Sequence, residues 1–172
     1  YDSAGIAGRT RSGLERRRAP GKLRELEAVL AREPLSATTG IGHTRWATHG
    51  APTHDNAHPH IAGRVAVVHN GIIENFAELK AELIASGRHF ESETDTEVVA
   101  HMIDHMLGTG LEPLNAFRAT LDRLSGAFAL CVLIEGEGDI ILAARNGPPL
   151  AIGYGKGEMY VGSDGLALGP FT

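Results

Sequence analysis

The chain has 172 residues, a net charge of −5, an apolar share of 42% and a charged share of 22%, which are ordinary values for one soluble domain. No apolar run approaches the ~20 residues that a membrane-spanning helix needs, so we expect no contact with a membrane. The acidic balance gives no sign of nucleic-acid binding. A single cysteine, Cys131, excludes an internal disulfide and is typical of a reducing compartment, so we expect a cytoplasmic protein.

Charge is distributed unevenly along the chain. Residues 1–35 carry eight Lys and Arg against five Asp and Glu, a net +3, whereas the remainder carries eight against sixteen, a net −8. The only basic cluster, Arg16–Arg18, lacks interleaved aromatic residues, and we expect it in a solvated turn or at a strand end. Neither end resembles a natural terminus, because the chain begins Tyr-Asp-Ser-Ala-Gly and stops without a polar tail. We therefore expect a piece of a longer protein.

Helices are predicted from apolar spacing and boundary residues. Leucines at helical spacing predict one helix over 21–33. Capping boxes at Asn75/Glu78 and Thr94/Glu97 predict two more, ending near Gly87 and Gly108, and Pro113 begins a fourth.

Strands are predicted over 40–47 and 65–69, the second ending in an Asn-Gly turn. The last third of the chain predicts strands over 126–134, 139–145, 149–154 and 158–163, joined by short Gly-rich turns that favour antiparallel pairing. These strands are apolar on both faces, so helices must cover the sheets. We predict one α+β domain with stacked antiparallel sheets.

Four polar clusters lie at expected strand ends and turns, where binding sites are usually built. Taken singly, each has a sufficient structural explanation as an edge strand, a histidine-capped loop, a turn or a helix start. The clusters are Gly42-His43-Thr44-Arg45-Trp46-Ala47-Thr48-His49-Gly50, Asn56-Ala57-His58-Pro59-His60, His69-Asn70-Gly71 and Ser92-Glu93-Thr94-Asp95-Thr96-Glu97.

Together these clusters describe a site for an amino acid with a reactive carbonyl. The planar guanidinium of Arg45 suits a carboxylate, and Asp95 suits an ammonium group. Asn70 and Gly71 can supply two hydrogen-bond donors to an oxyanion, as acyl transfer requires. A metal site is not expected, because no cysteine lies near the histidines and three or four ligands must converge.

In this order, the four clusters resemble the glutaminase domain of the glucosamine-6-phosphate synthase family, a class II amidotransferase with an N-terminal nucleophile. The similarity runs from Tyr1 to Asp164. The resemblance implies a four-layer αββα sandwich whose first strand and helix are missing here, within one truncated amidotransferase domain over 1–172. It implies L-glutamine as the substrate, L-glutamate as a product and no cofactor or metal.

The resemblance also implies roles for individual residues. Asn70 and Gly71 would form the oxyanion hole, Arg45 would bind the α-carboxylate of glutamine, and Asp95 would bind its α-ammonium group. Trp46, Thr48 and His49 would contact the substrate from a loop over about 45–53.

The catalytic cysteine of that family opens the chain and precedes the segment that starts here, so the 172 residues lack it. Cys131 cannot replace it, because it lies in an apolar strand where burial raises a thiol pKa. We therefore expect this piece alone to be inactive. The sugar-isomerase domains of the parent chain are absent as well. We expect the parent protein to be a homodimer.

Two alternatives remain open at this stage. The first is a glutaminase domain of another class II enzyme, such as amidophosphoribosyltransferase, and the second is a glutamine-binding module without a nucleophile. The second would require loss of a strand and helix that cover apolar surface in a packed sandwich.

Overall fold

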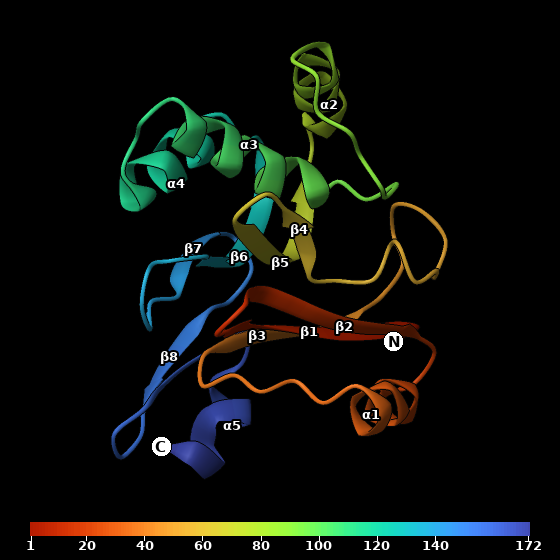
Figure 1. The fold of residues 1–172 in the computed structure, drawn as a ribbon, viewed down its shortest axis with the longest axis vertical. Coiled ribbons are helices and arrows are strands. Elements are labelled where there is room, and N and C mark those ends of the chain that lie inside the picture. The colour runs from red at the N-terminus through yellow and green to blue at the C-terminus, as the bar shows by residue number, and fades with distance from the viewer.

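The computed structural model describes residues 1–172 and contains two antiparallel sheets that pack face to face (Figure 1). Sheet A consists of β1 (Ser3–Thr10), β2 (Gly13–Pro20) and β3 (Gly40–Arg45), in the order β2-β1-β3. Sheet B consists of β4 (His60–Ala62), β5 (Val65–Ile73), β6 (Gly126–Ile134) and β7 (Leu142–Asn146), in chain order. A separate hairpin contains β8 (Ala151–Tyr154) and β9 (Met159–Gly162).

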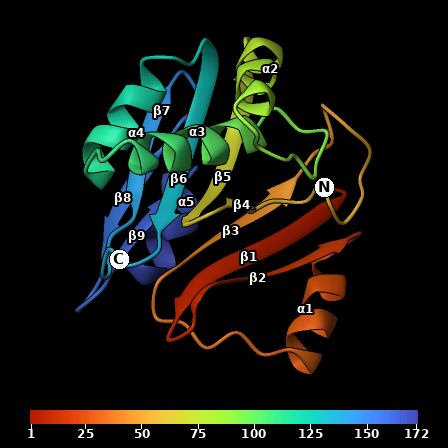
Figure 2. The same cartoon turned by 45° about the horizontal axis from the view of Figure 1, so that its top comes forward.

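Helices cover the outer faces of both sheets, as Figures 1 and 2 show. On sheet A lies α1 (Leu23–Arg32), and on sheet B lie α2 (Phe76–Ala85), α3 (Glu97–Gly108) and α4 (Pro113–Leu121). The short α5 (Gly165–Leu168) and a 3₁₀ turn over Gly169–Phe171 pack on the β8–β9 hairpin. The order is helix, sheet, sheet, helix, so the α+β sandwich expected from the sequence is confirmed.

Each pair of neighbouring layers encloses its own apolar cluster, and β5 shows why. Its residues Val65 and Val67 point to the helices on sheet B, whereas Ala66 and Val68 point to sheet A. All four are buried, because side chains alternate between the two faces of a strand and both faces are covered. The third cluster, between α1 and sheet A, contains Ala4, Ala19 and Leu26.

Two strands at the start of the chain, β1 and β2, were not predicted, and the expected solvated basic cluster lies inside β2. Arg18 is 5% exposed, and its guanidinium donates to the backbone carbonyls of Asp55 and Ala57. Burial lowers the pKa of Arg18 to about 10. The prediction of a solvated arginine was wrong, because the hydrogen-bond acceptors come from a loop about 38 residues away in the chain.

The predicted turn at Asn70-Gly71 was also wrong, because β5 continues through it to Ile73. Asn70 pairs with Ala129 and Gly71 with Phe128 in the ladder with β6. The positive φ of Gly71, +117°, is a conformation that other residues rarely adopt, and a Cβ there would lie 2.1 Å from the carbonyl oxygen of Ala127. Pairing with a long neighbouring strand thus overrides the local turn propensity.

Neither predicted capping box forms, although both helices begin close to the predicted position. Asn75 occupies the N-cap of α2, but its side chain hydrogen-bonds the backbone of Arg123 and Ser125. The carboxylate of Glu97 accepts hydrogen bonds from the backbone N–H groups of Glu91 and Ser92. In both cases the side chain holds a separate loop instead of its own helix end.

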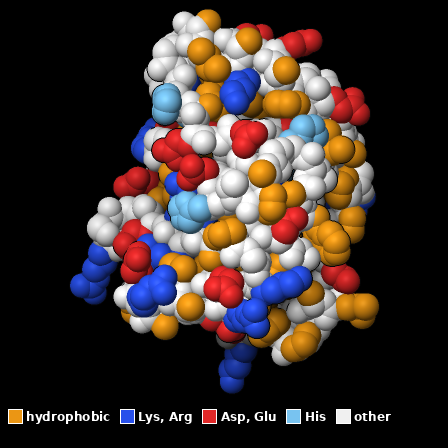
Figure 3. Space-filling model, turned by 90° about the vertical axis from the view of Figure 1, so that its right-hand side faces the viewer, with side chains coloured by type: hydrophobic (Ala, Val, Ile, Leu, Met, Phe, Trp, Pro, Cys, Tyr) orange, Lys and Arg blue, Asp and Glu red, His pale blue; other side chains and the backbone are white.

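The uneven charge of the sequence is visible on the surface. On the face drawn in Figure 3, most Lys and Arg side chains lie in the lower half, over sheet A and α1. None of the helices combines the length and apolar character that crossing a bilayer requires.

Candidate functional site

One cavity of about 280 Å³ is lined by every residue that the sequence assigned to the site. It lies where the end of β3, the end of β5 and the loop before α3 meet, which brings together three of the four polar clusters and one histidine of the fourth. The seven assigned residues are Arg45, Trp46, Thr48, His49, Asn70, Gly71 and Asp95.

Arg45 ends β3 on the face that points to sheet B and is 4% exposed. Its Nη1 donates to the carbonyl of Ala51 at 3.1 Å, and its Nη2 donates to the carbonyls of His49 and Gly50. These bonds hold the loop that follows β3. Arginine has five N–H donors, so Nε–H and one Nη1–H remain for an anion.

Asp95 lies in the loop before α3 and is 4% exposed. Its Oδ2 accepts a hydrogen bond from the backbone N–H of Ile73 at 2.8 Å, which ties this loop to the end of β5. The second oxygen, Oδ1, has no hydrogen-bond partner in the protein and is available to a cation in the cavity. Arg45 and Asp95 therefore place opposite charges in one cavity.

The amide side chain of Asn70 points to sheet A, as alternation along β5 requires. Its Oδ1 lies 2.8 Å from Nε2 of His43 on β3. Engagement of the carbonyl oxygen with His43 leaves the NH₂ group of the amide free to donate into the cavity. Gly71 follows directly and also lines the cavity.

Three histidines and a threonine form a buried hydrogen-bonded cluster behind Asn70. Nδ1 of His58 lies 2.8 Å from Nδ1 of His43, and Nε2 of His58 lies 2.9 Å from the hydroxyl of Thr96. The same hydroxyl lies 2.9 Å from Nδ1 of His69. Burial lowers the pKa of each of these histidines, that of His69 to about 4, so all three are neutral near pH 7.

Sequence reasoning did not assign His43, His58 or Thr96 to the site, although all three line the cavity. A signal was present in β3, because alternation places His43 and Arg45 on the same face. No local pattern connects His58 to Thr96, which is 38 residues away. No group of three His, Cys, Asp or Glu side chains is arranged to hold a metal ion.

The only cysteine is not part of this cavity. Cys131 points from β6 into the space between the sheets, and burial raises the pKa of its thiol to about 11. It lies on the floor of a groove between β3 and β9, where two smaller cavities of about 200 and 150 Å³ lie. The first of these cavities also contacts His43 and Asn70, so the groove leads to the site.

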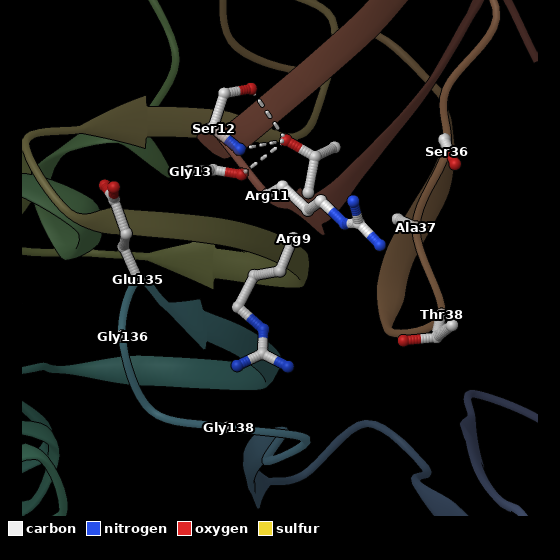
Figure 4. A pocket seen from close by; sticks show the side chains of 11 residues that line it. Arg9, Arg11, Ser12, Gly13, Ser36, Ala37, Thr38, Glu135, Gly136 and Gly138 are labelled. Carbon is white, nitrogen blue, oxygen red and sulfur yellow. Dashed lines mark hydrogen bonds between the residues drawn. The ribbon is translucent and has the colours of Figure 1, made fainter.

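A larger and more open cavity, of about 810 Å³, lies at the turn between β1 and β2 (Figure 4). Its Arg9 pairs with Asp139 at 3.0 Å, and hydroxyl groups and glycines provide most of the remaining lining. None of the residues assigned from the sequence lies there. The cavity of about 280 Å³ that contains Arg45, Asn70 and Asp95 is therefore the candidate site.

Comparison with known families gives one match, described as a glutamine amidotransferase domain, over residues 43–169. This range includes the candidate site and most of the chain. The chain belongs to the glutamine amidotransferase domain family. Its membership agrees with the resemblance seen in the sequence.

Two curated relatives of this amidotransferase domain carry the same name. The chain is 70% identical over its full length to glutamine–fructose-6-phosphate aminotransferase (isomerizing) from Caulobacter vibrioides, and 62% identical to the protein of that name from Bradyrhizobium diazoefficiens. It spans 28% of the length of each relative.

Solved structures of amidotransferases have the same fold. The glutamine phosphoribosylpyrophosphate amidotransferase from B. subtilis superposes with a TM-score of 0.77 at 26% identity, over 98% of this chain and 37% of that chain. A class II glutamine aminotransferase domain protein from Silicibacter pomeroyi, at 18% identity and a TM-score of 0.65, shares the fold over 92% of this chain and 78% of its own.

Proposed function

We propose that this domain hydrolyses L-glutamine to L-glutamate and ammonia within an enzyme that uses the ammonia to convert fructose 6-phosphate to glucosamine 6-phosphate. The observation that carries the proposal is the single cavity that holds Arg45, Asp95 and Asn70 together. The whole enzyme would be a transferase of hexosamine synthesis. The 70% identity to a glutamine–fructose-6-phosphate aminotransferase supports this acceptor over the phosphoribosyl acceptor of the 26% identical structure.

Recognition of glutamine uses the two buried charges. The free N–H groups of Arg45 bind the α-carboxylate, and Oδ1 of Asp95 binds the α-ammonium group. Trp46, Thr48 and His49 contact the substrate from the loop that Arg45 holds through its hydrogen bonds to backbone carbonyls. Binding of both charged ends directs the side-chain amide of glutamine to Asn70 and Gly71.

Acyl transfer then needs a nucleophile and an oxyanion hole. A thiolate attacks the amide carbon, the oxyanion accepts hydrogen bonds from the Asn70 amide and the Gly71 N–H, and ammonia leaves as a thioester forms. Water hydrolyses the thioester to glutamate and regenerates the thiol. The α-amine of an N-terminal cysteine, with a pKa of ~8, can accept the thiol proton near neutral pH and then donate it to the departing nitrogen, which leaves as ammonia.

The thiol comes from a segment outside these 172 residues. Two observations support this: Cys131 is half-buried in an apolar strand, which raises the pKa of its thiol, and the candidate cavity contains no thiol. The groove between β3 and β9 leads to His43 and Asn70, and each of these strands has one edge without a strand partner. A preceding strand in this groove would deliver a residue to the site and complete one truncated amidotransferase domain over 1–172.

Further parts of the enzyme lie beyond this domain. We place sugar-isomerase domains in the same parent chain, which spans more than three times this length in the relatives. We also propose that the parent protein is a homodimer and that it acts in the cytoplasm. The single unpaired cysteine supports the cytoplasmic location.

The proposal is tested on the whole parent protein by measuring glutamate release from glutamine. Asn70→Ala should lower kcat by ~10²–10³-fold and leave KM nearly unchanged, because the lost donor acts mainly in the transition state. Asn146→Ala, which removes an exposed amide from β7, is the matched control and should retain activity. Unchanged kcat in Asn70→Ala would overturn the oxyanion assignment.

A second experiment locates the nucleophile. A glutamine analogue with an electrophilic side chain should label one cysteine of the parent protein, at a position outside these 172 residues. Peptide mass spectrometry identifies the labelled residue. Stoichiometric labelling of Cys131 with loss of activity would show that the nucleophile is Cys131 instead.

A further inference from the structure

The buried cluster behind Asn70 is one continuous chain of hydrogen bonds. It runs from His69 to the hydroxyl of Thr96, then to His58, to His43 and to Oδ1 of Asn70. The four contacts measure 2.9, 2.9, 2.8 and 2.8 Å in this order. Three of the members, His58, His69 and Thr96, are at most 5% exposed, so water does not compete for the two bonds that join them.

The hydroxyl of Thr96 makes hydrogen bonds only to His58 and His69. Thr96 occupies the N-cap of α3, but its side chain makes no capping hydrogen bond. Its hydroxyl lies 2.9 Å from each of two imidazole nitrogens and has one hydrogen to donate. If both rings donated to it, its own O–H would be buried without an acceptor, so it donates to one ring and accepts from the other. The direction of that one O–H group therefore sets the direction of the whole chain.

Neutral histidines permit two directions. In the first, His69 Nδ1–H donates to Thr96, Thr96 donates to His58 Nε2, His58 Nδ1–H donates to His43, and His43 Nε2–H donates to Asn70. The amide then keeps its oxygen on His43 and its NH₂ group in the cavity. In the second, every bond reverses, and the amide turns its carbonyl oxygen into the cavity.

One feature selects the first direction. Nε2 of His69 is buried without a hydrogen-bond partner, and the second direction would place an unpaired N–H there, which folded proteins rarely tolerate.

We propose that Thr96 is a positioning residue: through His58 and His43 it fixes the Asn70 amide with its NH₂ group toward the cavity. This inference rests on the proposed glutaminase function, in which that NH₂ group donates to the oxyanion. A freely turning amide would present its oxygen to the developing negative charge for part of the time. A fixed amide needs no reorientation during the reaction, which is the source of oxyanion-hole catalysis.

The test uses the whole parent protein and an isosteric substitution. Thr96→Val keeps the shape of the side chain and removes the hydroxyl, and it should lower kcat for glutamine hydrolysis at least about tenfold with little change in KM. Thr96→Ser restores the hydroxyl and should recover most of the activity. Thr120→Val is the matched control, since Thr120 is also fully buried but its hydroxyl bonds only the Ala116 carbonyl within α4.

A double-mutant cycle separates positioning from a general structural effect. In an Asn70→Ala background the amide is absent, so Thr96→Val should cause no further loss of kcat. An equal loss in both backgrounds, or no loss in the wild-type background, would overturn the positioning role. If Asn70→Ala itself had no effect, the oxyanion role of Asn70 would fail instead. A wild-type parent protein that releases no glutamate from glutamine would refute the proposed function.

A second measurement uses the wild-type protein, so it does not depend on whether a variant folds. The ¹⁵N shifts of histidine side chains in the wild-type parent protein report which ring nitrogen carries the proton. The proposal predicts protons on Nδ1 of His58 and of His69 and on Nε2 of His43. Protons on Nε2 of His58 and His69 would show the opposite direction and would overturn it.

Discussion

At the residue scale, Arg45 combines a structural and a binding task, because three of its donors hold the loop over 49–51 and two remain for an anion. Burial lowers its pKa from the usual value, but the group stays a cation at neutral pH. A mutation therefore removes a charge partner of the substrate and also releases the loop.

Arg45→Ala should weaken binding of glutamine to the whole protein by ~2–4 kcal/mol, because the substrate carboxylate loses its buried partner. Titration calorimetry with glutamine or glutamate measures this loss. Arg24→Ala, which removes an exposed arginine from α1, serves as the control and should bind normally. Equal affinity in wild type and Arg45→Ala would refute the carboxylate role.

Cys131 illustrates how burial decides the reactivity of a single thiol. With a pKa of about 11, the thiolate that reacts with alkylating reagents is scarce at pH 7. Iodoacetamide should modify Cys131 slowly in the folded protein and quickly in denaturant, as followed by peptide mass spectrometry. Fast modification in the folded state would contradict the burial of this side chain.

At the scale of elements, β5 depends on a glycine at one position. Gly71→Ala should cost about 3 kcal/mol of stability, since the positive φ and the contact with Ala127 on β6 both oppose a Cβ. Gly87→Ala is the matched control: its φ of +94° is also positive, but nothing lies within 4 Å, and it should cost only ~1 kcal/mol. Calorimetric unfolding of this domain in the parent protein compares the two variants, and equal losses would show that the close contact has no effect.

At the scale of the whole molecule, buried titratable groups make stability depend on pH. Burial lowers the pKa of His60 to about 3 and that of His69 to about 4, so the unfolded chain binds more protons than the folded one below pH 6.5. Glu97 acts in the same direction at lower pH. Burial alone would raise its pKa, but hydrogen bonds from His101, Ser92 and backbone N–H groups lower it to about 2.

Stability should therefore be constant above pH 7, fall as the pH drops below 6.5 and fall further below 4.5. Urea midpoints measured between pH 7 and pH 4 test this expectation. His60→Gln should flatten the decline by removing a slope of ~1.4 kcal/mol per pH unit, whereas His54→Gln, at an exposed position, should leave it unchanged. A midpoint independent of pH in the wild type would contradict the buried, neutral state of these histidines.

The sequence by itself determined most helices, the strands of the last third and the stacked-sheet class, because apolar periodicity is a local property that burial later satisfies. The polar motifs, together with their resemblance to a known family, also named the seven residues that line the cavity. The apolar neighbours of Cys131 in its strand predicted a shielded thiol, and the structure has it half-buried. The helix ends were placed well even where the capping contacts were not, since Gly and Pro limit helices by their own backbone.

Tertiary structure decided what those patterns left open. Asn70-Gly71 continues a strand because β6 pairs with it. Arg18 is buried because a distant loop supplies carbonyl acceptors. The carboxylate of Glu97 holds the loop at Ser92 instead of capping its own helix. The chain from His69 through Thr96 to Asn70 joins residues that no periodic pattern relates. Hydrogen bonds between side chains are short-ranged and directional, so only packing of the two sheets and α3 in three dimensions could bring these groups within reach.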